Sequence, residues 1–341
     1  MKNKIIFRDS YDDLPEIIKD AGLETRKFYI VSDSNVAPLY LDAVKKTFKK
    51  APSFIFEAGE ARKHLDTVNE MYKCFQDDKL DRKSVIIALG GGVAGDMAGF
   101  AAATYMRGIS VIQLPTSLLA MVDASAGGKT GVNFMGVKNL IGAFHQPELV
   151  YINISALKTL PEDEFISGLG EVVKHGLIGG GGYYDFLYKN RSAIKNIDID
   201  VMLETVSGSC RIKSAVVEKD EKETGLRETL NFGHCVGHAV ESLSNYTIPH
   251  GKCVSMGMCA ALRLSSVPKD EYKKAAELME FFGLPVKIEI SNPKEIVSTM
   301  YKDKKTQSDT LRVVLLKKIG EAYTDSTLTD EKITECLYES Y

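Results

Sequence analysis

The stretch "VIIALGGGVAGDMAGF", Val85 to Phe100, indicates the fold class of the first half of the chain. An apolar run is followed by three glycines and then by small residues with a helical pattern. A strand that is apolar on both faces is typical of a parallel sheet covered by helices on both sides. A helix that begins directly after such a strand offers unpaired N–H groups and a positive dipole end to an anion. We therefore predict an α/β domain with a candidate phosphate-binding turn at Gly90 to Gly92.

The same alternation of strand and helix patterns extends from this stretch in both directions. Further strands are expected at 27–33, 53–58 and 109–117, and helices at 39–49, 64–76 and 94–106. This order is characteristic of a parallel sheet. The glycine turn lacks the spacing of the usual dinucleotide fingerprint and of a P-loop. A simple tight turn therefore remains the alternative to a phosphate site.

Helical patterns dominate the second half of the chain. Helices are expected at 162–178, 198–223, 228–243, 251–266, 270–283 and 329–341, and a β-hairpin at 310–324. The four glycines at 179–182 are expected to form a flexible turn between helices. We place the boundary near Leu160–Pro161, which predicts an α/β domain at 1–160 and a mostly helical domain at 161–341.

The composition is that of an ordinary globular protein, with 341 residues, 44% of them hydrophobic and 26% charged. The formal net charge is −3, which gives no general attraction to nucleic acid or to a membrane surface, so we expect neither partner. Six cysteines without a CxxC pair indicate reduced thiols, and the N-terminal segment lacks the apolar core of a signal peptide. We expect a cytoplasmic protein that binds any anionic ligand with a local cluster of cations.

A long loop is expected at 121–147, because few of its positions follow a helical or strand period. It carries Asp123, Lys129, Lys138 and Asn139 among many glycines. Long loops without secondary structure are usually functional or disordered, and the apolar residues here argue against disorder. The loop could be a solvated Ω-loop, or an anion cradle built from lysines and backbone N–H groups.

Two histidines, His234 and His238, stand four residues apart on one helical face. The Glu that follows the first His in zinc proteases is replaced here by Cys235. His250 and Glu171 could complete a site of two His and one Glu with an open position, as in catalytic zinc sites. Helical spacing does not choose which two of the three histidines bind a metal, and simple packing of a HxxxH pair remains possible.

Taken together, the motifs resemble the 3-dehydroquinate synthase family over nearly the whole chain. The matching runs occur in order as "GGGVAGDMAGFAAATYMRG", "LPTSLLAMVDASAGGKTGVN", "KNLIGAFHQP", "LPEDEFISGLGEVVKHG", "LRETLNFGHCVGHAVE", "IPHGKCVSMGM" and "DKK". A single glycine loop is weak support, whereas seven ordered matches are specific.

The resemblance implies a sugar-phosphate cyclase fold, with an N-terminal NAD-binding α/β domain and a mostly helical, metal- and substrate-binding C-terminal domain. It implies an active site in the cleft between the domains and a homodimer. The implied enzyme is a carbon–oxygen lyase of the shikimate pathway, which leads to chorismate and the aromatic amino acids. It converts 3-deoxy-D-arabino-heptulosonate 7-phosphate, a phosphorylated heptulosonate, to 3-dehydroquinate and phosphate. The implied steps are transient oxidation by NAD+, β-elimination, reduction, ring opening and intramolecular aldol closure.

The resemblance also assigns roles to individual residues. Glu171, His234 and His250 match the ligands of one divalent metal, zinc or cobalt, and His238 matches a contact of the substrate phosphate. Other phosphate contacts match Lys129, Asn139, one lysine of "DKK" (Lys304 or Lys305, of which we favour Lys305) and Arg107, which would reach the neighbouring subunit's site. Arg227 and Asn231 match the carboxylate partners, and Asp123, Lys174 and Lys213 match groups around the hydroxyls. The matched NAD contacts are Asp33, Asn35, Glu60, Lys63, Gly91, Asp96, Thr116, Ser117, Lys129, Lys138 and Thr159.

The chain departs from the family at three places, none of them a catalytic position. Gly170 replaces an Ala, His175 replaces a Tyr, and Cys235-Val236 replaces Thr-Phe. Alternative functions are another sugar-phosphate cyclase of the 2-deoxy-scyllo-inosose synthase type, a metal-dependent polyol dehydrogenase, and an NAD-binding protein without activity. The other cyclase would have no substrate carboxylate for Arg227 and Asn231 to bind. The polyol dehydrogenase would not need the full set of cationic residues.

Overall fold

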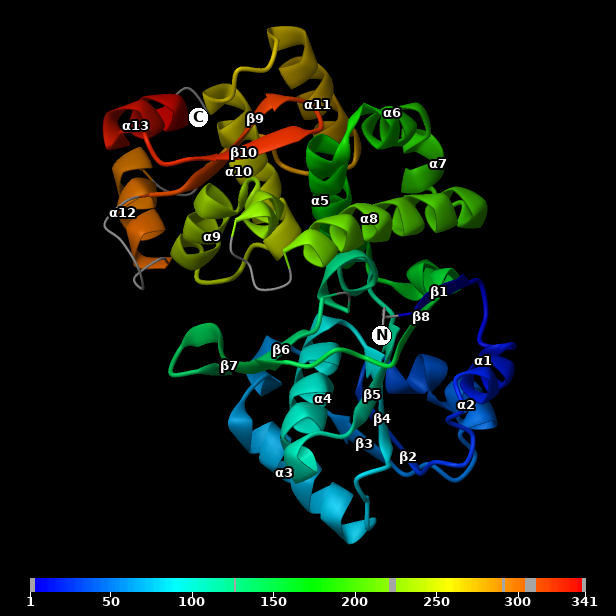
Figure 1. The fold of residues 1–341 in the computed structure, drawn as a ribbon. Coiled ribbons are helices and arrows are strands. Elements are labelled where there is room, and N and C mark those ends of the chain that lie inside the picture. The colour runs from blue at the N-terminus through cyan, green and yellow to red at the C-terminus, as the bar shows by residue number, and fades with distance from the viewer. Residues whose placement is uncertain (1–3, 126, 221–224, 290–291, 304–310, 339–341) are drawn as a thin grey trace. The chain divides into compact units, whose positions relative to one another are not determined.

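The structure is a computed structural model that describes residues 4–125, 127–220, 225–289, 292–303 and 311–338. The chain divides into two compact units, Met1–Leu160 and Pro161–Tyr341. Figure 1 shows the elements of each unit, and each is described by itself. No helix in the described part of the chain is both long and apolar enough to cross a membrane.

The first unit is built on a six-stranded parallel sheet, which confirms the α/β prediction. The strand order is β1-β8-β5-β4-β2-β3. The strands are β1 (Lys4–Arg8), β2 (Phe28–Asp33), β3 (Ser53–Phe56), β4 (Val85–Gly90), β5 (Ser110–Pro115) and β8 (Leu149–Asn153). All residues of β4 and β8 are buried, as expected for strands that helices cover on both faces.

Helices cover both faces of this sheet. They are α1 (Leu14–Asp20) and α2 (Ala37–Thr47) on one face, and α3 (Leu65–Asp77) and α4 (Gly92–Thr104) on the other. Alternate residues of β4 enter the two cores, because successive side chains of a strand point to opposite faces. Ile87 packs with the α1 and α2 side, and Ile86 packs with the α3 and α4 side.

Four short turns of helix join these elements. They are η1 (Glu60–Arg62), η2 (Tyr105–Arg107), η3 (Ala120–Ala124) and η4 (Ile154–Thr159). Within η2, Met106 and Arg107 have positive φ values of 51° and 69°. Such values are uncommon for non-glycine residues. One of the two residues, Arg107, is a predicted contact of the substrate phosphate.

The strand order creates a topological switch point between β2 and β4. The connection that leaves β2 runs to β3 on one side, and the connection that leaves β4 runs to β5 on the other. In open α/β sheets, ligands bind beyond the carboxyl ends of the strands at such a point. Asp33 ends β2 and Gly90 ends β4, so the predicted phosphate-binding turn lies at this position.

The prediction of a loop without secondary structure at 121–147 is wrong. Most of it forms an antiparallel hairpin of β6 (Lys129–Phe134) and β7 (Val137–Phe144). Gly131 pairs with Gly142, and a Cβ on Gly142 would lie 2.2 Å from the carbonyl oxygen of Thr130. The close approach of the two strands requires glycines, and glycines remove the alternating side-chain pattern by which a strand is recognised.

The second unit is mostly helical, as predicted. Its helices are α5 (Glu162–Gly179), α6 (Gly181–Lys189), α7 (Arg191–Lys195), α8 (Ile199–Lys219), η5 (Leu226–Asn231), α9 (His234–Leu243), α10 (His250–Leu264), α11 (Lys269–Phe281), α12 (Pro293–Asp303) and α13 (Asp330–Tyr338). The predicted hairpin is confirmed as β9 (Val313–Lys318) and β10 (Glu321–Asp325).

Two expectations in this unit need correction. The helix expected at 228–243 is interrupted, because Gly233 adopts the left-handed conformation with φ 79° and α9 begins only at His234. A Cβ on Gly233 would lie 2.6 Å from Cγ of Met258 on α10, so glycine is required there. The turn expected at 179–182 is a single residue, Gly180, with φ 120° between α5 and α6.

Candidate functional site

At the carboxyl edge of the parallel sheet, four of the predicted NAD contacts lie around the switch point. Asp33 accepts hydrogen bonds from the backbone N–H groups of Asn35 (2.9 Å) and Val36 (3.0 Å). Gly91 is the N-cap of α4, and a Cβ there would lie 3.4 Å from Oγ of Ser117. The helix N-terminus is thus bare enough for a pyrophosphate to approach.

A polar network lies beside this edge and joins Lys63 to predicted contacts of two different ligands. Lys63 is buried, with 5% of the residue exposed. Its ammonium group donates hydrogen bonds to Oδ2 of Asp96 (2.6 Å) and to Oδ1 of Asn139 (2.5 Å). Loss of water raises the pKa of Asp96, while the charge of Lys63 opposes that rise. The network brings together Asp96 and Lys63, assigned to NAD, and Asn139, assigned to the phosphate.

The other predicted residues of the first unit are spread over several elements. Glu60 lies in η1, Thr116 follows β5, Asp123 lies in η3, Lys129 in β6 and Lys138 in β7. Thr159 ends η4, where its hydroxyl contacts Tyr40 and donates to the carbonyl of Ala156. Arg107 is exposed at the end of η2.

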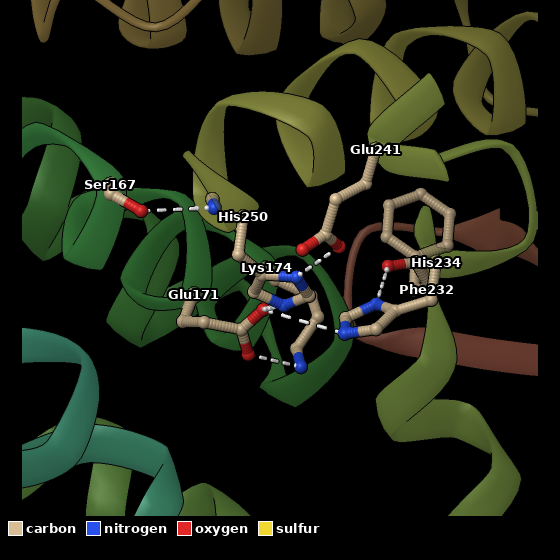
Figure 2. A network of polar contacts seen from close by, with 8 residues as sticks. Ser167, Glu171, Lys174, Phe232, His234, Glu241 and His250 are labelled. Atoms are coloured by element: carbon tan, nitrogen blue, oxygen red, sulfur yellow. Dashed lines mark hydrogen bonds and ion pairs between the residues drawn. The ribbon is translucent and has the colours of Figure 1, made fainter. Parts of the chain in front are cut away.

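In the second unit, three helices place one carboxylate against two imidazoles. Oε1 of Glu171 on α5 lies 3.6 Å from Nε2 of His234 on α9 and 3.8 Å from Nε2 of His250 on α10. Figure 2 shows the three side chains pointing toward one another. Two ligands of a tetrahedral zinc ion, each about 2.0–2.1 Å from the metal, stand about 3.3 Å apart. The observed separations are close to that value.

The histidines present the correct nitrogen to a metal. Nδ1 of His234 is 3.2 Å from the carbonyl oxygen of Phe232, and Nδ1 of His250 is 3.1 Å from Oε2 of Glu241. In the neutral ring, a proton on Nδ1 would be held by these acceptors, and Nε2 would keep its lone pair for a metal. Both Nε2 atoms face Glu171.

The electrostatic environment of the two imidazoles differs. Burial, together with the charge of Lys174 and the two neighbouring histidines, lowers the pKa of His234 well below its usual value. Burial alone would lower the pKa of His250, but the hydrogen bond to Glu241 and the charge of Glu171 outweigh burial and raise it. The negative charge that raises this pKa favours any cation at Nε2, a metal ion included.

The two oxygens of Glu171 have different surroundings. Lys174, 2% exposed, contacts Oε2, whereas the buried Oε1 accepts no hydrogen bond from the described residues. A buried carboxylate oxygen without a donor is costly, and a bound cation would satisfy it. One carboxylate oxygen and two imidazole nitrogens are a donor set that suits zinc or cobalt. The residues therefore fit a divalent ion.

Geometry alone also admits His238. The nitrogens of His234, His238 and His250 all lie within 4.8 Å of one another, so the alternative left open by the helical spacing is not closed by distance. Because Oε1 of Glu171 lies 3.6 Å from Nε2 of His234 and 3.8 Å from Nε2 of His250, these two histidines can join Glu171 around one ion.

Close helix packing brings Glu171 on α5 and His250 on α10 together. A Cβ on Gly251 would lie 1.7 Å from the carbonyl oxygen of Ser167, and one on Gly170 would lie 2.5 Å from the carbonyl oxygen of Gly251. The N–H of Gly251 also donates to Oγ of Ser167 (3.0 Å). Gly170 thus allows α5 and α10 to approach backbone to backbone.

The remaining predicted residues of the second unit come from two further elements. Lys213, on α8, is buried, as is Arg227 in η5, and Asn231 ends η5. The N–H of Arg227 donates to Oδ2 of Asp220 (2.9 Å). The choice between Lys304 and Lys305 lies outside the described residues.

Sequence reasoning missed Glu241, which orients His250. A signal was present, because Glu241 follows His234 by seven residues and His238 by three, and such spacings share one face of a helix. A search for a carboxylate in phase with both histidines would have found it.

Comparison with known proteins agrees with the fold. Family models described as 3-dehydroquinate synthase N-terminal and C-terminal match residues 53–167 and 168–306. A 3-dehydroquinate synthase from Acetivibrio thermocellus is 43% identical over 338 residues, which cover 96% of this chain and 93% of that protein.

Solved structures share the whole fold. A 2-deoxy-scyllo-inosose synthase complexed with carbaglucose-6-phosphate, NAD+ and Co²⁺ matches with a TM-score of 0.86 and 28% identity, covering 99% of this chain and 96% of that chain. A 2-epi-5-epi-valiolone synthase from Streptomyces hygroscopicus, with NAD+ and Zn²⁺ bound, matches in fold with a TM-score of 0.90, 24% identity and the same coverage. The fold and the matching family models are those of the sugar-phosphate cyclases. Within that class, the chain belongs to the 3-dehydroquinate synthase family.

Proposed function

We propose that this protein is a 3-dehydroquinate synthase, which converts 3-deoxy-D-arabino-heptulosonate 7-phosphate to 3-dehydroquinate and phosphate with NAD+ and one divalent metal. The observation that carries the proposal is the unpaired Oε1 of Glu171 facing Nε2 of His234 and His250. Membership of the family supplies the substrate. Zn²⁺ or Co²⁺ is the proposed ion, since those ions accompany NAD+ in the solved relatives.

The roles of the residues follow from their chemistry. When bound, NAD+ would take and return a hydride while the metal ion polarised the substrate's oxygens. Lys174 holds one oxygen of Glu171 and thereby turns the other toward the histidines. Arg227, with a planar guanidinium, suits the substrate carboxylate, and Lys129 and His238 suit the phosphate.

We further propose that the protein is a cytoplasmic homodimer in which Arg107 reaches the phosphate of the neighbouring subunit's substrate. The support is family resemblance together with the exposed position and positive φ of Arg107. Residues held in uncommon backbone conformations cluster at active sites and switch regions.

A coupled assay tests the activity. Phosphate release from the heptulosonate phosphate and absorbance of NADH should be followed in the same cuvette. We expect phosphate release that needs only catalytic NAD+, stops with a chelator and leaves no lasting NADH. Accumulating NADH would indicate a polyol dehydrogenase, and no phosphate release would direct attention to sugar phosphates that lack the carboxylate.

The orientation of His250 by Glu241 gives a second prediction. Glu241→Gln should weaken Zn²⁺ binding about tenfold, at the lower end of the 10–100-fold range for such outer partners, because the amide keeps the shape but loses the charge. Competition with a chromophoric chelator measures the affinity. Ser242→Ala, exposed on the same helix, is the matched control, and an unchanged affinity in Glu241→Gln would contradict the role of Glu241.

A further inference from the structure

The hairpin of β6 and β7 is irregular at Asn133. Val132 pairs with Ile141 and Phe134 pairs with Val137, so residues 138–140 of β7 lie opposite Asn133 alone. An irregularity of this kind interrupts the ladder and turns side chains in new directions, and bulges are common beside active sites. Here it leaves Asn139 with φ 53°, a left-handed conformation that asparagine tolerates better than most residues.

Asn133 replaces the missing ladder with three hydrogen bonds. Its backbone N–H donates to the carbonyl of Lys63 (2.8 Å). Its side-chain Oδ1 accepts from the N–H of Asn139 (2.9 Å), and its Nδ2 donates to Oε1 of Glu60 (2.8 Å). The orientation of the amide is fixed, because an N–H needs an acceptor and a carboxylate needs a donor.

These bonds hold both ends of Asn139. Its backbone is held by Asn133, and its side-chain Oδ1 accepts from Nζ of Lys63, which Asp96 holds from the other side. Asn133 therefore contacts Glu60, Lys63 and Asn139, although it has no role in the proposed mechanism.

We propose that Asn133 is a positioning residue that couples the NAD+ contacts Glu60 and Lys63 to the phosphate contact Asn139. It acts through these residues and touches neither ligand. The inference rests on the proposed function, since that function assigns Glu60 and Lys63 to NAD+ and Asn139 to the phosphate.

A charge-swap experiment tests the coupling. Asn133→Asp keeps the acceptor for Asn139 but places a carboxylate against Glu60, so the dissociation constant of NAD+ should rise roughly tenfold. Adding Glu60→Gln supplies an amide donor for the new carboxylate. The hydrogen bond between positions 60 and 133 is then restored, with residue 60 as the donor and residue 133 as the acceptor. The double variant should bind NAD+ more tightly than the product of the two single effects predicts. Calorimetric titration of NAD+ into the whole protein measures all four forms.

Asn133→Ala removes both side-chain bonds and separates positioning from simple stability. We expect the KM for the heptulosonate phosphate and the dissociation constant of NAD+ each to rise roughly tenfold, at temperatures well below the melting transition. Met135→Asn is the control, because Met135 is 87% exposed with φ 48°, which suits asparagine.

Two results would overturn the inference. The first is a double variant whose NAD+ dissociation constant equals the product of the two single effects of Asn133→Asp and Glu60→Gln. The second is an Asn133→Ala variant with a lowered melting temperature but an unchanged NAD+ dissociation constant and an unchanged KM. The proposed function can fail separately. Wild-type protein that binds NAD+ but releases no phosphate would contradict the proposed function, and the NAD+ titrations of the four forms would still test the coupling between Asn133 and Glu60.

Discussion

Replacing Glu171 with glutamine should lower metal-dependent turnover about 10³-fold or more, since a catalytic metal contributes several kcal/mol to the barrier. Glutamine keeps the volume of the side chain and leaves no cavity. It removes the charge from the oxygen that faces Nε2 of His234 and of His250. Titration with Co²⁺, followed by its visible absorption, reports metal binding independently of turnover.

The same change should also destabilise the protein. Lys174 and Glu171 are 2% and 1% exposed, and Glu171→Gln leaves the lysine charge buried without its carboxylate. Breaking a buried pair from one side costs about 3–5 kcal/mol. Denaturant unfolding of the metal-free protein should show a loss of that order.

A double variant separates the two effects. Glu171→Gln with Lys174→Met removes both buried charges, so the free energy of unfolding should recover to within about 1 kcal/mol of the wild-type value. Co²⁺ binding should not recover. Glu171→Gln protein that binds Co²⁺ as tightly as wild type would show that Glu171 is not a ligand, and the cluster of His234, His238 and His250 would then become the preferred site.

The parallel sheet could be predicted because its signals are local. The apolar strand at Val85, the glycines after it and the small residues of α4 are adjacent in the chain, and they specify strand, turn and helix in that order. The helices of the second unit carry equally local periodicity. By contrast, the β6–β7 hairpin depends on the pairing of Gly131 with Gly142, which no pattern within either strand reveals.

The candidate site was predictable only in part for the same reason. Residue types and spacing nominated Glu171, His234, His238 and His250, but spacing could not choose among the histidines. The choice depends on which imidazole nitrogens face the oxygen of Glu171 that Lys174 leaves unpaired. Those are contacts between distant segments, and the sequence contains no local record of them.

Gly251→Ala should be the most damaging change of a single methyl group near Glu171, His234 and His250. The new Cβ would lie 1.7 Å from the carbonyl oxygen of Ser167, and backbone cannot rotate away as a side chain could. Overpacking costs about 1–3 kcal/mol and occasionally more, so we expect about 3 kcal/mol of lost stability. Denaturant unfolding of the metal-free protein measures this loss.

The same methyl group should weaken metal binding, because α10 must move away from α5 and His250 is the residue next to Gly251. Nε2 of His250 would then lie farther from Glu171. A loss of about 1.4 kcal/mol in binding free energy weakens Co²⁺ binding tenfold, and we expect at least a tenfold loss in a Co²⁺ titration. Gly182→Ala is the matched control in the same unit, because no atom of the described residues lies within 4 Å of its added Cβ. That control should stabilise α6 by up to about 1 kcal/mol, the difference between glycine and alanine in a helix. If Gly251→Ala lost stability but bound Co²⁺ like the control, close packing of α5 and α10 would hold the fold together without positioning His250.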